Sequence, residues 1–203
     1  MCVAGVSSQA AQLVNGDFQT GDFTGWTFFT TSQGGLGQPT VVLFDTANIG
    51  TPSLSARFEA GQTNGVVTGA KYGGGIFQNV TLGPGQLNIS LDIAASSPGV
   101  NGDGGTFELL LDGSVVASHS FASMAPNQPQ WSTLSYSGSV TAGVHDIEVE
   151  LLRGSFLQIG ETPYQYLDNI QLSGTAVVPE PSTVSLLLLS GIAVMRYRKL
   201  HIS

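Results

Sequence analysis

Three carboxylates occupy alternate positions in the second half of the chain: Asp146, Glu148 and Glu150. Two carboxylates can serve as the acid and the nucleophile of a glycoside hydrolase when they lie roughly 5 to 9 Å apart. Alternate residues of one strand are about 6 to 7 Å apart, so this spacing allows such a pair. The intervening residues 147, 149 and 151 are apolar, however, and assign the opposite face of the strand to the core. We therefore interpret the carboxylates as part of a solvated outer face.

The other residue types that carry chemistry lack the spacing that a reaction needs. The histidines, His119, His145 and His201, form no HExxH motif, and no serine lies in a Gly-x-Ser-x-Gly elbow. The glycines at positions 73–75 lack the Lys-Ser/Thr of a phosphate loop. The single cysteine, Cys2, excludes an internal disulfide and a cysteine metal cluster. The sequence thus predicts a protein that is not an enzyme, and a polysaccharide-active enzyme is the least favoured alternative.

The charge distribution divides the chain into an acidic body and a basic end. The 203 residues include 6 basic and 14 acidic ones, for a formal net charge of −8. Half of the basic residues lie among the last eight positions, so no basic stripe crosses the body, and nucleic acid is not an expected partner. With 41% hydrophobic and 10% charged residues, the chain is predicted to bury a sizeable core.

Alternation of apolar and polar residues, rather than a helical repeat, runs through residues 13–174. Asp112-Gly113 stands between two apolar runs as a hairpin signal. About eight or nine strands without helical crossovers predict one all-β domain, an antiparallel β-sandwich of jelly-roll type. Loops are expected at the glycine-rich positions 34–37 and 73–75. The expected strands cover residues 40–44, 53–58, 76–82, 87–93, 106–111, 115–121, 131–136, 147–151 and 166–172.

Both ends of this domain carry a short motif. The start reads Val-Asn-Gly-Asp-Phe-Gln-Thr-Gly over residues 14–21, followed by Gly25-Trp26, and the end reads Tyr-Leu-Asp-Asn-Ile-Gln-Leu over residues 166–172. In this order, the motifs resemble the opening and closing signatures of galactose-binding-like jelly rolls, a group that includes several families of bacterial carbohydrate-binding modules. The resemblance implies a jelly roll over residues 13–174 that binds carbohydrate.

The same resemblance implies a structural calcium ion where the opening and closing strands meet. Carried over to this chain, the ligands would be Asp168 and Gln19, with Gln19 in the place of the usual acid. An amide carbonyl is an acceptable calcium ligand, but the loss of an anionic ligand weakens a site. The alternative is that Asp168 only caps or hydrogen-bonds the neighbouring turn.

A sugar-binding module is expected to use exposed aromatic side chains, flanked by amide or acid groups that hydrogen-bond the sugar. The tryptophans Trp26 and Trp131 are expected in the core, because one follows the opening glycine and the other starts a strand. Tyrosines in loops are better placed for exposure. The predicted glycan-binding residues are Tyr72 and Tyr164, with Gln62 and Asn64 in a nearby polar loop.

Residues 177–203 consist of a proline-rich element, an apolar run and a basic cluster. The 15 uncharged residues 181–195 would form a helix roughly 22 Å long, which is short of the ~30 Å hydrocarbon core of a bilayer. Such a transmembrane-type helix spans only where the bilayer thins or flanking residues help, and the basic cluster favours a cytoplasmic C-terminus. The alternative is a buried core helix. The residues that define this pattern are Pro179, Glu180, Pro181, Arg196, Arg198 and Lys199.

This arrangement resembles the PEP-CTERM sorting signal of Gram-negative bacteria. The resemblance implies processing near the Pro-Glu-Pro element by an exosortase-type membrane enzyme, after transient anchoring in the inner membrane. The body would then reach the cell surface or the extracellular matrix of a bacterium that produces exopolysaccharide and biofilm. Residues 1–12 contain no Lys or Arg, and Ser8-Gln9-Ala10 fits a cleavage site, so we interpret them as the remnant of a truncated signal peptide.

The sequence therefore predicts an exported, non-catalytic surface or matrix protein whose domain binds glycans of the exopolysaccharide. The alternative is a structural adhesion or biofilm-matrix component that has no sugar site and is held in place by its processed tail.

Overall fold

The structure of the protein is a computed structural model that describes residues 13–32, 34–61, 72–99, 102–121, 123–153 and 163–176. The predicted signal-peptide remnant, Gln62, Asn64 and the predicted sorting signal with its helix lie outside these residues. In the described part of the chain, ten strands pair antiparallel. They are β1 (Thr27–Thr30), β2 (Thr40–Phe44), β3 (Ser53–Phe58), β4 (Tyr72–Leu82), β5 (Gly85–Ser96), β6 (Gly105–Leu111), β7 (Ser114–Phe121), β8 (Gln130–Val140), β9 (Gly143–Arg153) and β10 (Tyr164–Ser173).

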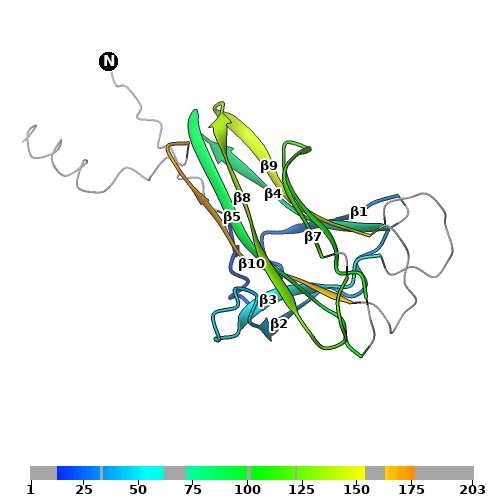
Figure 1. Ribbon diagram of the computed structural model, residues 1–203. Coiled ribbons are helices and arrows are strands. Elements are labelled where there is room, and N and C mark those ends of the chain that lie inside the picture. Colours follow the sequence, from blue (N-terminus) through cyan, green and yellow to red (C-terminus); the bar gives the residue numbers. More distant parts are fainter. Residues whose placement is uncertain are drawn as a thin grey trace, which may run out of the picture.

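The order of the strands defines the fold. One sheet has the order β1-β4-β9-β6-β7 and the other has the order β2-β3-β10-β5-β8 (Figure 1). From β3 to β10 the pairing is nested, first strand with last: β3 with β10, β4 with β9, β5 with β8, and β6 with β7. Nested pairing of eight strands in two sheets is the topology of a jelly roll. The prediction of an all-β antiparallel sandwich is confirmed for the described residues.

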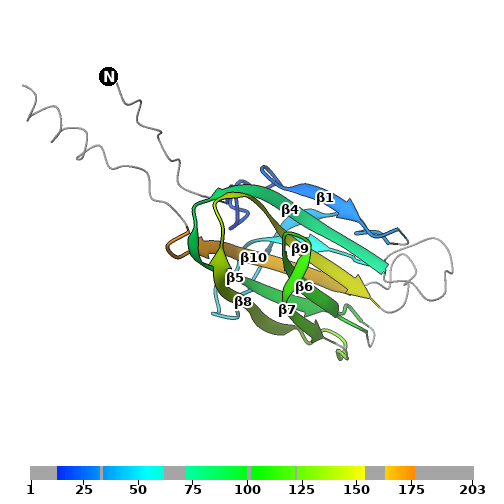
Figure 2. The ribbon, with the colours of Figure 1, turned by 90° about the horizontal axis from the view of Figure 1, so that it is seen from above.

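The core lies between the two sheets, and the alternation seen in the sequence decides which side chains enter it. Along β5, Leu87, Ile89, Leu91 and Ile93 are buried, whereas the residues between them face away from the core. β9 repeats this pattern in the opposite sheet, which β1 extends at one edge next to β4 (Figure 2). Burial of one side-chain row from each sheet excludes apolar surface from water and fixes the strand register.

Residues 73–75 were expected in a loop, and this expectation is wrong. Gly73, Gly74 and Gly75 lie inside β4, which pairs with β1 on one side and with β9 on the other. A Cβ at Gly73 would clash with the carbonyl oxygen of Leu151, and one at Gly75 would clash with the ring of Phe29. The glycines thus allow a close approach of neighbouring strands and of an aromatic ring, which is the packing role of glycine in a strand interior.

β1 is the one described strand that the alternation in the sequence did not predict. Its four residues, Thr-Phe-Phe-Thr, contain no apolar and polar alternation, and most of them are exposed. The strand is held at the sheet edge by pairing of Phe28 with Ile76 and of Phe29 with Gly75. Pairing with β4, rather than burial of one face, therefore determines this element.

The hairpin predicted at Asp112-Gly113 is confirmed. It joins β6 to β7, and both turn residues have positive φ angles, 52° for Asp112 and 73° for Gly113. Positive φ at both positions is the requirement of a tight type I′ turn, which Asp-Gly meets at little cost. Among the described residues, no helix is long and apolar enough to cross a membrane.

Candidate functional site

The surface of sheet β2-β3-β10-β5-β8 that points away from the core, here called the outer face, combines aromatic and polar side chains. One row of register partners crosses all five strands on this face: Thr40, Arg57, Tyr166, Ala94 and Trp131. Because register partners stand directly opposite each other, these residues from distant parts of the chain lie in one line. This line joins a cation to two aromatic rings.

Tyr164 extends the aromatic end of the row. Its ring meets that of Tyr166 edge to face, with 6.4 Å between the ring centroids. The guanidinium carbon of Arg57 lies 4.7 Å from the centroid of the Tyr164 ring, within the range of a cation–π contact. Tyr164 is only partly buried, so it is positioned on the outer face as a glycan-binding residue would be.

The turn that follows β2 crosses over part of the outer face. β2 and β8 are the edge strands, which a flat sheet of five strands would hold about 19 Å apart. However, Nε1 of Trp131 in β8 donates a 2.8 Å hydrogen bond to the carbonyl of Asp45, directly after β2. The ring of Phe44 stacks on Tyr166 with 3.7 Å between centroids. The sheet edge therefore curls over the face and leaves Tyr166 5% exposed and Trp131 37% exposed.

Trp131 was expected in the core, and its exposure corrects that prediction. The core residue of this part of β8 is Leu134, three positions further along the strand. An odd separation places two residues of one strand on opposite faces, so Trp131 must face outward. This spacing is visible in the sequence and would have revealed the residue. The prediction for the other tryptophan is confirmed, since Trp26 is buried.

Beside the aromatic row, the outer face of β5 and β8 carries hydrogen-bonding side chains that we call the polar ladder: Gln86, Asn88, Asp92, Thr133 and Ser137. Ser137 donates to the side-chain oxygen of Asn88 at 2.7 Å, and Gln86 donates to Ser137 at 3.0 Å. Thr133 donates to Asp92 at 3.1 Å. Partly exposed amides, hydroxyls and a carboxylate thus stand in a row next to the aromatic rings.

Asp168 lies on the same face but is fully buried, with 0% exposure. Its Oδ2 accepts hydrogen bonds from the hydroxyls of Ser53 and Ser55, and its Oδ1 accepts one of 2.7 Å from the amide of Asn169. Burial, to which the charge of Asp92 adds, raises the pKa of Asp168, although the three hydrogen bonds act in the opposite direction. Asn169 has a φ of 52° at an irregularity of β10, so Asp168 stabilises a local backbone turn.

The contacts of Asp168 give no support for a calcium ion. Its oxygens face hydrogen-bond donors, whereas calcium needs a shell of oxygen acceptors. Gln19 is exposed and donates from its side-chain amide to the carbonyl of Asp17, and it forms no hydrogen bond with Asp168. Within the described residues, no group of three or more His, Cys, Asp or Glu side chains could hold a metal ion. Calcium binding stays a prediction without support from these contacts.

The second predicted glycan-binding tyrosine, Tyr72, is 2% exposed, so its expected exposure is wrong. It does not lie in a loop, because β4 begins at this residue and pairs it with Arg153 of β9. Its position in β4 matches that of the core residues Ile76 and Val80, which are separated from it by even numbers of residues. The partners predicted for it, Gln62 and Asn64, lie outside the described residues.

The alternating carboxylates occupy the outer face of the other sheet, as predicted. Asp146, Glu148 and Glu150 are partly exposed on β9, while the residues between them enter the core. Burial raises the pKa of Glu148, and the charges of Glu150 and Asp146 add to the effect. The sheet therefore presents a solvated acidic surface.

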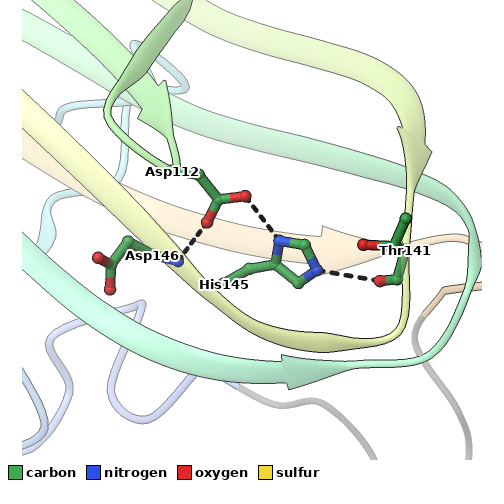
Figure 3. Close-up of polar contacts among 4 residues, drawn as sticks. All are labelled: Asp112, Thr141, His145 and Asp146. Carbon is green, nitrogen blue, oxygen red and sulfur yellow. Dashed lines mark hydrogen bonds and ion pairs between the residues drawn. The ribbon is translucent and has the colours of Figure 1, made fainter.

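A buried histidine links β9 to the hairpin turn between β6 and β7 (Figure 3). Nδ1 of His145 lies 2.7 Å from the carboxylate of Asp112, and Nε2 lies 3.0 Å from the carbonyl of Thr141. Both partners only accept hydrogen bonds, so both ring nitrogens donate when both contacts are made, and the imidazole is then protonated. The hydrogen bond with Asp112 raises the pKa of His145 despite its burial. Sequence reasoning missed this contact, because it joins a residue of β9 to a turn that lies 33 positions earlier in the chain.

Comparison with known proteins finds distant likenesses in structure. No protein-family model matches the chain, and no curated protein matches it. Among solved structures, the carbohydrate-binding module TmCBM61 in complex with β-1,4-galactotriose is 15% identical, with a TM-score of 0.49 over 82% of this chain and 99% of that chain. A structure described as CBM4 is also 15% identical, with a TM-score of 0.42 over 81% of this chain and 100% of that chain.

A third similar structure is an arabinose-bound α-L-arabinofuranosidase, MgGH51. It is 13% identical, with a TM-score of 0.49 over 81% of this chain and 26% of the enzyme chain. With TM-scores below 0.5, these likenesses add nothing to the jelly-roll order that the strand pairing already establishes.

Proposed function

We propose that the domain is a non-catalytic glycan-binding module and that its binding surface is the outer face. The observation that carries this proposal is the cross-strand row that brings Arg57 and the exposed Trp131 onto one face, with Tyr164 beside Arg57. Aromatic rings bind the apolar faces of pyranose rings, and nearby polar groups fix the orientation of the sugar.

The polar ladder supplies the second component of such a site. Its amides, hydroxyls and Asp92 present both donors and acceptors, which suit the hydroxyl groups of a sugar. These side chains already hydrogen-bond one another, so they are held in place before a ligand arrives. Preorganisation of this kind reduces the entropy that binding would otherwise cost.

The test is affinity electrophoresis of the full chain in gels that contain β-1,4-galactan, xylan or mixed-linkage β-glucan. We expect retardation by at least one glycan and a loss of at least about tenfold in affinity in Trp131→Ala and in Tyr164→Ala. Trp131→Phe keeps a ring but removes the hydrogen bond to Asp45, and it should retain part of the binding. Phe29→Ala removes a ring from the outer face of the other sheet and is the matched control.

Wild-type protein that is retarded by no glycan would contradict the proposal. It would favour a structural adhesion or biofilm-matrix component without a sugar site. Equal retardation of the wild type, Trp131→Ala and Tyr164→Ala would show that any binding occurs elsewhere. Turnover of a polysaccharide would contradict the non-catalytic assignment.

We also propose that the protein is exported and sorted through its tail. Support comes from the Pro-Glu-Pro element at 179–181 and the basic residues Arg196, Arg198 and Lys199, in the order of a PEP-CTERM signal. An exosortase-type enzyme of the inner membrane would process the tail and release the body to the cell surface or matrix. In a host with such an enzyme, a Pro179→Ala/Pro181→Ala variant should stay in the membrane fraction, whereas the wild type should leave it. The same distribution for both would refute the assignment.

A further inference from the structure

We infer that the glycan recognised by the outer face is acidic and that Arg57 binds its carboxylate. This inference rests on the proposed glycan-binding function and adds the chemical class of the ligand. Arg57 lies in β3, between Thr40 on one side and Tyr166 on the other, within the cross-strand row of the outer face.

Arg57 is a cation without a counterion in the described part of the chain. Its guanidinium lies over the ring of Tyr164 and its charge acts on the Tyr166 hydroxyl, whereas the ion pair found among the described residues joins His145 to Asp112. Its Nε has no hydrogen-bond partner, although that atom is shielded from solvent, and the same holds for the hydroxyl of its register partner Thr40. Two adjacent polar groups with unmet hydrogen bonds indicate a position for a polar ligand.

Two acids of the outer face, Asp168 and Asp92, are hydrogen-bonded to residues other than Arg57. Asp168 accepts hydrogen bonds from Ser53, Ser55 and the backbone of Asn169. Asp92 accepts hydrogen bonds from Thr133 and from the side chain of Asn169. Within the described residues, neither carboxylate forms an ion pair with Arg57, so its guanidinium is open to the carboxylate of a ligand.

The geometry suits a uronic acid residue of a polysaccharide. Contact with the ring of Tyr164 restricts the guanidinium, which can form paired hydrogen bonds to a carboxylate. A uronic acid offers that carboxylate on a pyranose ring, whose apolar face can pack on an aromatic side chain. Because the protein as a whole is acidic, a polyanion is repelled at long range, and recognition depends on this one short contact.

The test compares an acidic polysaccharide with its own carboxyl-reduced form, which keeps the sugar sequence and removes the charge. Polygalacturonate and alginate, each in both forms, are titrated into the full chain by isothermal calorimetry. We expect the wild type to bind at least one acidic form at least about tenfold more tightly than its reduced form, as a hydrogen-bonded charge pair implies. Arg57→Gln should bind both forms equally, and Arg57→Lys should retain part of the preference.

Asn79→Asp is the matched control, because it lowers the net charge by the same amount on the exposed outer face of the other sheet. It should keep the wild-type preference. Thermal unfolding identifies variants that fail to fold, and Arg57→Lys tests the proposal if Arg57→Gln is one of them. Equal binding of both forms by the wild type would overturn the inference and leave the glycan-binding function intact. The role of Arg57 would be overturned if folded Arg57→Gln kept the preference for the acidic form, or if Asn79→Asp lost it. If the wild type bound no glycan at all, the proposed function itself would be refuted.

Discussion

The contact between His145 and Asp112 makes stability depend on pH in a defined window. The pKa of His145 is raised above its ordinary 6.5, so this group stabilises the fold below pH 6.5, and the contribution is lost as the pH rises through the raised pKa. Burial acts to raise the pKa of Asp112, but hydrogen bonds from His145 and from the amide of Asp146 lower it below 3.8. Its contribution is present above 3.8 and is lost as the pH falls through the lowered pKa. Both charges therefore stabilise the fold between about pH 4 and 6.5.

The substitution Asp112→Asn removes the charge and preserves the turn, because Asn also tolerates the φ of 52° at this position. A hydrogen bond to a charged group contributes about 1.5 to 3 kcal/mol. The side chain of Asp112 is 50% exposed, so solvent screening reduces this value. We expect a loss of about 1 to 1.5 kcal/mol at pH 5.5 and a decrease in Tm of about 2 to 5 °C.

Thermal and urea unfolding of the full chain at pH 5.5 and at pH 9 measures this effect. At pH 9 less of His145 is protonated than at pH 5.5, so the difference between the two proteins should shrink toward a few tenths of a kcal/mol, roughly the value of an exposed surface change. Asp17→Asn, which removes the same charge from an exposed turn, is the control and should show no such dependence. An equal loss at both pH values would refute the reasoning, because the turn rather than the charge pair would then account for it.

Three further predictions concern the folded domain. Gly73→Ala should destabilise it by about 1 to 3 kcal/mol in urea unfolding, because the new Cβ meets the backbone of Leu151 and a strand must move; an unchanged midpoint would contradict this packing. Asp168→Ala should lower the free energy of unfolding by about 1 to 3 kcal/mol, since it leaves the Ser53 hydroxyl without its acceptor and removes one acceptor from Ser55. If calcium binds at Asp168, calcium should raise the Tm of the wild type but not of Asp168→Ala, and no change on chelation would reject calcium binding.

The strands that bury one face are predictable from the sequence because burial imposes a period of two. This holds for β5 and β9, in which every second residue is apolar. It fails for Gly73–Gly75, since glycine carries no side chain that could show a pattern, and the reason for its presence is the neighbouring strand. Local signals therefore identify strands that contribute side chains to the core but not those that are shaped by contact with other strands.

For the candidate site, the sequence allowed prediction of the kinds of side chain but not of most of their positions. Aromatic and amide side chains were expected, and Tyr164 does lie on the outer face, but Tyr72 proved to be buried. The row that contains Arg57 and Trp131 depends on the register of five strands, and residues of β3, β10, β5 and β8 that become neighbours are far apart along the chain. Without the strand order, neither the partners of Arg57 nor the contact of Trp131 with the turn after β2 can be derived.

The nested strand order also determines when the domain can fold. β10 is the middle strand of its sheet, where it joins β3 to β5, so before it is synthesised that sheet exists only as two separate strand pairs. Bringing Leu167 opposite Ala56 closes a loop that spans most of the domain, and the entropy of this closure is lost before the contact is gained. Such long-range pairing slows folding and prevents its completion on the ribosome while β10 is still inside the exit tunnel. The nascent chain therefore stays in an open state until almost all of the domain has been made, and the insertion of β10 completes the sheet.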